Sequence, residues 1–478
     1  MNQKRTQSPF GFVGHELSGK VLSFTPEFHS HQMHAIDFTH DPERKSWVES
    51  ANDDGCDFPI QNLPYGCFVG KSGGQRIGVA IGDQILDLAA VAELLPSFAT
   101  DVVSSETLNR LMRLPVEQRI ELRHAISSLL HNGTEADKAK LEAALVSQDS
   151  VPMALPCHIH DYTDFYASIY HATNVGSMFR PNNPILPNYR HIPIGYHGRA
   201  SSVVPSGTPV RRPVGQKAPA EEGAASTRSA SALLDYEMEV GFFVAGENEL
   251  GSTIPIEKSE ASLFGMCLVN DWSARDLQKW EYQPLGPFLA KSFATSISPW
   301  IITMEALAPF RCPQFQRPEG DPQPLDYLDS EFNRKSGGVL INMEVLLASE
   351  KMRNENVLPH KLSRTSFTNM YWTIAQMLTH HASNGCNIKA GDLMASGTVS
   401  GPGRDERGCL LELTWNGDAK NPLPGSDRTP LKLPTGEERK FLADGDEVIF
   451  RGYCETDSHR RIGFGECRGV VLPAIETV

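Results

Sequence analysis

A run of polar side chains at residues 270–282 has the residue types and the spacing of a site that handles charge. It reads Asn-Asp-Trp-Ser-Ala-Arg-Asp-Leu-Gln-Lys-Trp-Glu-Tyr. In a helix, positions i, i+4, i+7 and i+11 share one face, which here carries a carboxylate, a guanidinium, an amide and a phenol. The apolar run 263–269 before it has the length of a buried strand, so the stripe begins where that strand ends. The segment therefore predicts either a solvent-facing helix or a catalytic face made of Asp271, Arg275, Gln278 and Tyr282.

Acidic residues alternate with apolar ones at 234–240. In a strand, Glu237 and Glu239 project from the same face, a few ångströms apart. An exposed edge strand would leave them in water, whereas a divalent cation would relieve their repulsion if further carboxylates joined them. Asp271 and Asp164 are candidates to join them, although an aspartate near a helix start is also a common capping residue. Oxygen donors without thiolate or imidazole favour Mg²⁺, Ca²⁺ or Mn²⁺ over zinc or copper.

The segment 166–180 contains a histidine, His171, and ends at Arg180. His171 lies seven residues after Asp164, so a continuous helix would place both side chains on one side. An isolated histidine is more often structural than catalytic. Beside a carboxylate-bound cation, however, it would be the side chain best suited to take a proton from water near neutral pH. Both interpretations of His171, structural and catalytic, remain open at this point.

Composition limits the partners and the compartment. A chain of 478 residues predicts two domains. With 44 Lys and Arg against 58 Asp and Glu, the net charge of -14 argues against nucleic acid or an anionic membrane as the main partner. The nine cysteines contain no Cys-x-x-Cys pair, which is typical of free thiols in a reducing compartment. No apolar run is long enough to cross a bilayer and no signal-peptide pattern is present, so we expect a cytoplasmic location.

Two regions of different pattern must position these residues. Residues 58–90 alternate short apolar runs with turns, as strands do, and 105–147 show helical spacing. After Pro152 and Pro156 the composition changes, which predicts a domain boundary near residue 155. The remainder is expected to be rich in strands, including 339–347, 408–415 and 447–453, with a helix at about 366–381. Three polar stretches, 218–231, 316–338 and 416–438, are expected to be surface insertions.

Taken together, these motifs resemble the fumarylacetoacetase family, hydrolases that act at the end of tyrosine breakdown. The resemblance covers about residues 60 to 478. The matching segments are Asp161–Tyr166, His171–Gly176, Ile194–Ser202, Leu234–Glu239, Asn270–Asp276, Trp280–Tyr282, Pro284–Leu289, Lys291–Phe293 and Ala395–Thr398.

The resemblance implies a mixed, β-rich α+β architecture and a homodimer. Residues 1–155 would hold an N-terminal arm, a small SH3-like barrel and a helical segment. Residues 156–478 would form the catalytic domain of the fumarylacetoacetase fold, a mixed β-roll.

The resemblance also implies a role for individual residues. The metal ligands would be Asp164, Glu237, Glu239 and Asp271, with a second cation near Lys291 and Thr295. Substrate contacts would fall at Tyr166, Arg180, Tyr196, Gln278, Tyr282 and Thr398. The catalytic residues would be His171 with its partner carboxylate Glu412, together with Arg275, Gln278 and Lys291.

The activity implied is hydrolysis of a carbon–carbon bond in a β-diketo acid, fumarylacetoacetate plus water giving fumarate and acetoacetate, with Mg²⁺ or Ca²⁺ as cofactor. An acylpyruvate hydrolase or an oxaloacetate decarboxylase would share the carboxylate cluster. Such relatives are expected to be shorter and to lack the N-terminal domain and the Tyr166-to-Arg180 pattern. A catalytically silent, metal-stabilised scaffold would tolerate the loss of His171, Glu412 and Lys291, all of which are present here.

Overall fold

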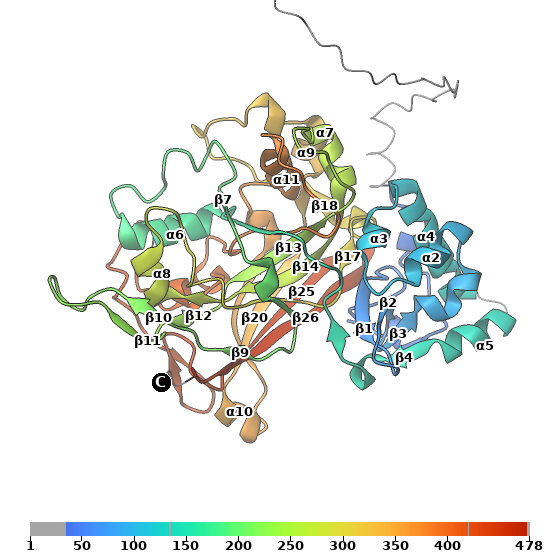
Figure 1. Ribbon diagram of the computed structural model, residues 1–478, viewed down its shortest axis with the longest axis horizontal. Coiled ribbons are helices and arrows are strands. Elements are labelled where there is room, and N and C mark those ends of the chain that lie inside the picture. Colours follow the sequence, from blue (N-terminus) through green and yellow to red (C-terminus); the bar gives the residue numbers. More distant parts are fainter. Residues whose placement is uncertain (1–34, 133–134, 419, 476–478) are drawn as a thin grey trace, which may run out of the picture.

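The computed structural model describes residues 35–475, apart from 133–134 and 419 (Figure 1). An antiparallel sheet in the order β4-β3-β2-β1-β5 forms the centre of the N-terminal part. Helices α2 to α5 lie around it (Figure 1). The bounds are β1 Tyr65–Val69, β2 Gln75–Ile81, β3 Gln84–Asp87, β4 Leu145–Ser147, β5 Met153–Ala154, α2 Thr100–Val103, α3 Asn109–Met112, α4 Val116–Asn132 and α5 Glu135–Ala143. The expected strands at 58–90 and helices at 105–147 are confirmed, while the SH3-like barrel stays a prediction.

Helix α4 joins the N-terminal part to the rest of the molecule. Its start follows Pro115, and the buried side chains of Leu122, Ile126 and Leu130 recur every four residues, so they form one apolar face. Two arginines of the same helix are buried. Arg119 donates to the backbone carbonyl of Leu263 in the C-terminal part at 3.1 Å, whereas Arg123 contacts the N-terminal part itself. Arg123 donates to the backbone carbonyls of residues 61 and 62 at 2.6 and 2.8 Å.

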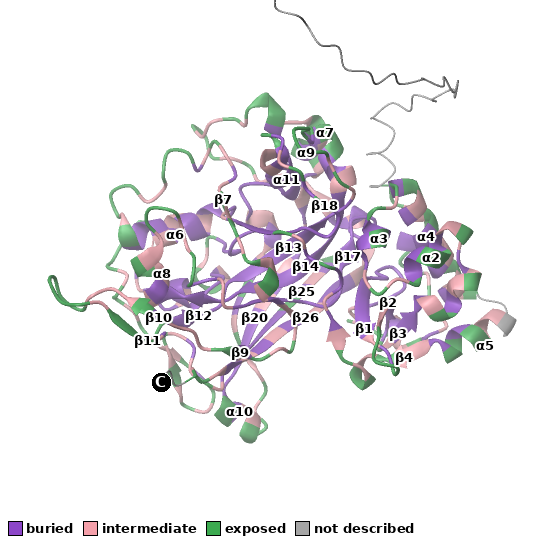
Figure 2. Cartoon of the chain, in the orientation of Figure 1, coloured by how far each residue is buried: buried purple, intermediate pink, exposed green. Residues whose placement is uncertain are grey.

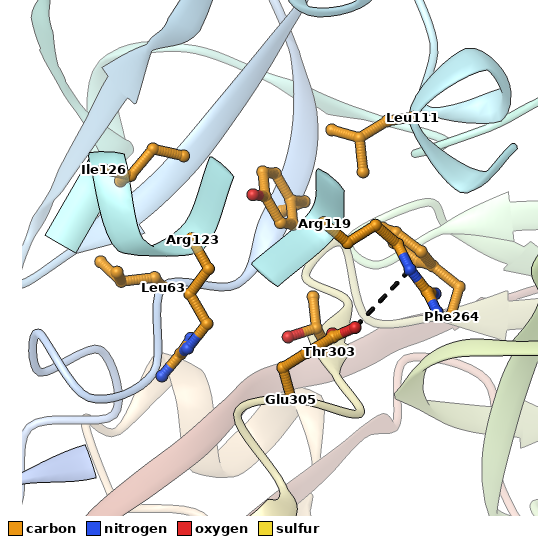
Figure 3. A pocket seen from close by; sticks show the side chains of 9 residues that line it. Leu63, Leu111, Arg119, Arg123, Ile126, Phe264, Thr303 and Glu305 are labelled. Atoms are coloured by element: carbon orange, nitrogen blue, oxygen red, sulfur yellow. Dashed lines mark ion pairs between the residues drawn. The ribbon is translucent and has the colours of Figure 1, made fainter. Parts of the chain in front are cut away.

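Arg119 of α4 and Glu305 point toward each other across a small cavity, with a nitrogen–oxygen distance of 3.6 Å (Figure 3). Buried charges that are paired in this way fix the orientation of the two parts, because separating them would leave a charge without a partner. None of the lining residues belongs to the predicted site. They are Leu63, Tyr65, Leu111, Arg119, Arg123, Ile126, Phe264, Thr303 and Glu305.

Two sheets form the C-terminal part. The larger one is mixed, in the order β7-β6-β22-β13-β14-β16-β8, and β17 also pairs with β14. The smaller one has the order β21-β20-β25-β26-β9. The first comprises β6 Tyr162–Phe165, β7 Gly195–His197, β8 Val203–Pro205, β13 Met238–Val244, β14 Leu263–Asp271, β16 Thr295–Ile297, β17 Ile302–Thr303 and β22 Leu393–Ala395. The second comprises β9 Val210–Arg211, β20 Asn342–Ala348, β21 His360–Ser366, β25 Glu447–Thr456 and β26 His459–Leu472.

Strand β14 contacts β25 and β26, so the core lies between the two sheets. Leu268, Phe450 and Phe464 are fully buried there. Strands β13 and β14 are drawn in the colour of buried residues (Figure 2). Four short strand pairs and seven helices of the described residues complete the C-terminal part. The pairs are β10 Val214–Lys217 with β11 Thr227–Ala230, β12 Leu234–Asp235 with β15 Ser273–Ala274, β18 Arg311–Cys312 with β19 Gly338–Val339, and β23 Leu431–Lys432 with β24 Glu438–Arg439. The helices are α6 Ile169–Phe179, α7 Ile256–Ser259, α8 Arg275–Glu281, α9 Glu331–Ser336, α10 Glu350–Asn354, α11 Ile374–Ala382 and α12 Leu410–Leu413.

The pairing of β13 with β14 sets the position of two predicted site residues. The antiparallel register places Glu239 opposite Val269, which brings Glu239 and Asp271 to the same end of the pair. At the other end, a bulge between Phe243 and Val244 shifts the register. The site therefore lies at the regular end of this ladder.

The stripe at 271–282 is not a single helix, so the predicted common face for Asp271 is wrong. Strand β14 continues through Asp271, which pairs with Thr295 of β16, and this ladder holds its backbone extended. Helix α8 begins only at Arg275, and Tyr282 follows it as the C-cap residue. Arg275, Gln278 and Tyr282 keep their helical spacing, but Asp271 comes to them through the sheet.

Asp164 and His171 do not share a helix either. Asp164 lies in β6, where it pairs with Ala395 of β22. Helix α6 begins at Ile169, and its N-cap is Ser168, whose hydroxyl accepts a hydrogen bond from the His171 backbone N–H. The capping role considered for Asp164 is therefore filled by Ser168.

Two expected elements differ from those observed. The segment 408–415, expected as a strand, contains the short helix α12, while the strand ends expected at 339–347 and 447–453 are confirmed within a few residues by β20 and β25. The helix expected at 366–381 is α11, which starts later because β21 extends to Ser366 and Thr373 forms a capping box with Gln376. The polar stretch 218–231 holds the turn and the second strand of the β10–β11 hairpin, which is largely exposed (Figure 2). The other two stretches hold α9 and most of the β23–β24 pair.

Candidate active site

Four buried carboxylates meet where strands β6, β13 and β14 of the larger sheet begin or end. Asp164 lies in β6, Glu239 in β13 and Asp271 at the end of β14, while Glu237 stands between β12 and β13. One oxygen from each lies within 4.8 Å of the others. Strands β6 and β13 both pair with β22, and β13 pairs with β14, which explains how residues from distant parts of the chain converge. The structure thus brings together all four predicted metal ligands.

The electrostatics of the cluster are those of a site that needs a cation. Burial and the repulsion from Asp271 raise the pKa of Asp164 well above its usual value. Burial and the repulsion from Asp164 likewise raise the pKa of Glu239. One buried oxygen of Asp164 and one of Glu239 have no hydrogen-bond partner in the described part of the chain. Unpartnered carboxylate oxygens that converge in this way fit a hard divalent cation.

Lys291 lies against the cluster as a fixed positive charge. Its ammonium contacts Glu237 and donates to Asp271 Oδ2 at 2.6 Å. Burial disfavours the charge, but Asp271 and Glu237 outweigh burial and raise the pKa of Lys291, which stays protonated. An ammonium has no lone pair, so this side chain does not fit as a metal ligand. Thr295, predicted near a second cation, donates to Asp271 Oδ1 at 2.7 Å.

Arg275 reaches the cluster from the start of α8. Its Nη1 donates to Glu237 Oε1 at 2.5 Å and to Gln278 Oε1 at 3.2 Å. Although burial raises the pKa of Glu237, Lys291 and Arg275 outweigh it, and the net pKa lies below the usual range. Because the oxygen of Gln278 is occupied by Arg275, its amide nitrogen remains the donor of that side chain.

His171 and Glu412 form a buried pair. His171 Nδ1 lies 2.5 Å from Glu412 Oε2, and the two side chains are 4% and 0% exposed. Burial raises the pKa of Glu412, but the charge and the hydrogen bond of His171 outweigh it and lower the pKa to about 2. A carboxylate that stays ionised keeps the proton of the imidazole on Nδ1. His171 Nε2 is then the acceptor that a general base requires.

Further donors fix Glu412 in place. Asn174 donates to Oε1 at 2.7 Å, while Ser400 and the Cys409 thiol donate to Oε2 at 2.8 and 3.2 Å. His171, Cys409 and Glu412 are close enough to be considered a metal site. A tetrahedral ion would hold nitrogen and oxygen ligands roughly 3.3 Å apart, so the 2.5 Å contact fits a hydrogen bond rather than a zinc site.

The predicted substrate contacts lie around these two groups of residues. The Tyr166 ring meets the His171 ring edge-on, with 5.3 Å between centroids. Tyr196 donates to Asp271 Oδ2 at 2.8 Å. Arg180 follows α6 as its C-cap, and its Nε, like the buried hydroxyl of Thr398, has no partner among the described residues. A ligand could satisfy these two unpartnered donors. Among the described residues, no side-chain contact ties Tyr282 to the site.

Sequence reasoning missed several residues of this network. Asn174, Ser400 and Cys409 surround Glu412, and no pattern in the chain marks them. Asp235 is different, because the alternation at 234–240 puts it on the same strand face as Glu237 and Glu239. The alternation that marks the two glutamates therefore also marks Asp235.

Comparison with known proteins places the chain in a family. The model of the fumarylacetoacetase N-terminal domain matches residues 61–156, and that of the fumarylacetoacetate hydrolase C-terminal domain matches residues 162–472. The chain therefore belongs to the fumarylacetoacetate hydrolase family, and it is a hydrolase.

Relatives of high identity extend over nearly the whole chain. The fumarylacetoacetase of Caenorhabditis elegans is 51% identical over 432 residues, which cover 87% of this chain and 97% of the relative. The fumarylacetoacetases of Homo sapiens and Bos taurus are each 48% identical over 445 residues, covering 90% of this chain and 99% of each relative.

Proposed function

We propose that this protein is a fumarylacetoacetase, which hydrolyses fumarylacetoacetate to fumarate and acetoacetate. The observation that carries the proposal is the pairing of a buried His171–Glu412 dyad with a cluster of four carboxylates. A positive charge on His171 would lower the pKa of Glu237 in that cluster, so the two groups lie within electrostatic reach of each other. The relatives named fumarylacetoacetase match along both parts of the chain.

Asp164, Glu237, Glu239 and Asp271 would hold a divalent cation, Mg²⁺ or Ca²⁺. When bound, such a cation supplies Lewis acidity that polarises the oxygens of a β-diketone. A second cation would lie near Lys291 and Thr295, where the Thr295 hydroxyl is an oxygen donor beside Asp271. The oxygen-only donor set supports this choice, because it matches the preference of hard cations.

The chain's own residues would carry the proton and the developing charge. His171 takes a proton from water at Nε2, while Glu412 holds the imidazole in the required tautomer. Lys291, Arg275 and the Gln278 amide donate hydrogen bonds to the oxygen that gains negative charge. Arg180 binds the terminal carboxylate of the substrate, and a planar guanidinium suits that contact. Tyr166, Tyr196, Tyr282 and Thr398 would border the substrate.

A direct assay tests the proposal. Purified protein with Mg²⁺ is expected to remove the ultraviolet absorbance of fumarylacetoacetate, and a chelator is expected to abolish this loss until the cation is returned. An acylpyruvate and oxaloacetate serve as competing substrates. Turnover of either of them, without turnover of fumarylacetoacetate, would replace the proposed substrate by that of another branch of the family.

We also propose a homodimer, supported by exposed apolar side chains in the segment 280–289. Leu285 and Phe288 are 95% and 67% exposed. Burying such side chains against a second copy would remove apolar surface from water. Light scattering during size-exclusion chromatography is expected to give twice the chain mass, and Leu285→Asp with Phe288→Asp is expected to shift it toward the monomer. Leu358→Asp, at an 82% exposed position elsewhere, is the matched control. A wild-type monomer would contradict the proposal.

We also propose that the chain is divided into two domains. A first domain would span 1–155 and the catalytic domain 156–478, with the arm before residue 35 outside the described residues. A cytoplasmic location is supported by the cysteines, which are free thiols in the described chain. No helix among the described residues meets the length and hydropathy needed to span a membrane.

A further inference from the structure

Asp235 is a fully buried carboxylate that binds two separate parts of the candidate site. Its Oδ2 accepts from Arg275 Nε at 2.9 Å, and Arg275 Nη2 lies at the same distance. On the other side, its Oδ1 and Oδ2 accept the backbone N–H groups of Leu410 and Leu411 at 2.8 and 3.0 Å. Asp235 is 0% exposed, so these partners replace water completely.

The local structure explains why one carboxylate reaches both partners. Strand β12 pairs with β15, which places Asp235 opposite Ser273, two residues before Arg275. Helix α12 begins at Leu410 without a side-chain cap from its own N-cap residue, Cys409. The first N–H groups of a helix need acceptors from outside it. Asp235 supplies those acceptors from 175 residues away in the chain.

Two chains of hydrogen bonds meet at this side chain. One runs through Arg275 to Glu237 and from there to Lys291, at the carboxylate cluster. The other runs through α12 to Glu412 and His171. In the described part of the chain, Asp235 makes no hydrogen bond or ion pair with the four carboxylates or with the dyad itself. It is therefore placed to set the position of one relative to the other.

We propose that Asp235 is a positioning residue that holds the His171–Glu412 dyad in register with the carboxylate cluster. The inference deepens the proposed function and rests on it. A displacement of about 1 Å between reacting groups is enough to slow an enzyme by about 10²-fold. Metal binding needs only the cluster, so it does not depend on this alignment.

The variant Asp235→Asn separates an effect on turnover from an effect on metal binding. An amide group keeps one oxygen acceptor, but its nitrogen would face the N–H of Leu411 and the guanidinium of Arg275, which are both donors. The amide nitrogen of the substituted side chain would then face two other hydrogen-bond donors. The resulting repulsion would move α12 and Arg275 apart. We expect kcat to fall by about 10²-fold, while the Mg²⁺ concentration for half-maximal activity stays within about threefold of wild type.

A double mutant distinguishes a positioning role of Asp235 from a general loss of protein stability. If Asp235 acts through the dyad, Asp235→Asn should cost little further activity in a His171→Ala background, because residues of one unit are not additive. Asp446→Asn is the matched control. Asp446 is also 0% exposed and binds an arginine, Arg439, and the backbone N–H of Ala443, but it lies outside the site. This control is expected to lower the melting temperature and to leave kcat unchanged.

Each outcome has a defined meaning. Wild-type protein without activity on fumarylacetoacetate would reject the proposed function, and the ratio of variant to wild type is interpreted only when wild type is active. An unchanged kcat in Asp235→Asn, or a loss that multiplies in full with that of His171→Ala, would overturn the positioning role. If Asp235→Asn does not fold, Asp235→Glu keeps the charge and displaces both partners, and kcat should still fall. Failure of both to fold, with Asp446→Asn folded, would make Asp235 a folding residue and overturn the proposal.

Discussion

The His171→Ala variant is expected to lose turnover of fumarylacetoacetate while keeping its affinity for a divalent cation. General-base catalysis contributes about 10²- to 10⁴-fold, and kcat should fall by at least that factor. His171 is not one of the four candidate metal ligands, so the Mg²⁺ affinity of the variant, measured by calorimetry, should match that of wild type. Glu412→Gln should also lower kcat, because an amide no longer fixes the Nδ1–H tautomer with a charge.

A second buried histidine provides the control. His40 is 4% exposed, as is His171, and its Nε2 lies 2.9 Å from the backbone oxygen of Glu305, away from the carboxylates. His40→Ala should therefore cost stability but not kcat. Full activity in His171→Ala would remove His171 from the role of base, and equal losses in both variants would reduce the effect to damaged packing.

Glu239→Gln is expected to change stability in opposite directions with and without metal. In metal-free protein, the variant removes one of four clustered negative charges, so the melting temperature should rise. With Mg²⁺ present, the variant should lose both activity and the stabilisation that binding gives to the folded state. Melting curves in chelator and in saturating Mg²⁺ measure both effects. A variant that melts at a lower temperature than wild type in chelator would show that repulsion between Glu239 and the neighbouring carboxylates does not destabilise the folded protein.

The same cluster predicts how pH acts on the metal-free protein. The pKa values of Asp164 and Glu239 are raised in the folded state, so their ionisation opposes folding as pH increases. Stability should therefore increase as pH falls from neutral toward the usual carboxyl range of about 4. Glu412 does not reverse this trend above about pH 4.5, because its pKa is lowered from 4.5 to about 2 in the folded state and its stabilising contribution is lost only as pH falls below 4.5. Saturating Mg²⁺ should flatten the dependence.

The matched control for Glu239 is a carboxylate with a partner. Glu260 is 2% exposed and accepts from Arg311 at 2.7 Å. Glu260→Gln removes the charge that balances a buried guanidinium, so it should lower the melting temperature in chelator and in Mg²⁺ alike. In chelator, Glu239→Gln should raise the melting temperature and Glu260→Gln should lower it. A general effect of mutation would not produce changes of opposite sign.

The sequence predicted the chemistry of the site better than its backbone. Side-chain type identified the four oxygen donors, and the family resemblance supplied Glu412, because chemistry depends on residue identity. The shared helix for Asp271 and Arg275 was wrong because the ladder with β16, which holds Asp271 extended, is a long-range contact. Helix α12 was missed for the same reason, since its cap comes from Asp235. Short helices stabilised from distant strands have no local signal.

The bulge in the β13–β14 pair has a consequence for how this chain tolerates change in length. It lies between Phe243 and Val244, next to the connection 245–262 and at the opposite end of the pair from Glu239 and Asp271. A strand that slips by one residue turns every side chain to the other face, which would send Glu239 into the apolar core. Because the irregularity lies at the connection's end, the ladder near the carboxylates is separated from it by regular pairing. Within the connection, residues 249–253 are exposed, whereas Ile256 and Glu260 are buried. We therefore expect an inserted residue to be accepted at 249–253 without moving the carboxylates.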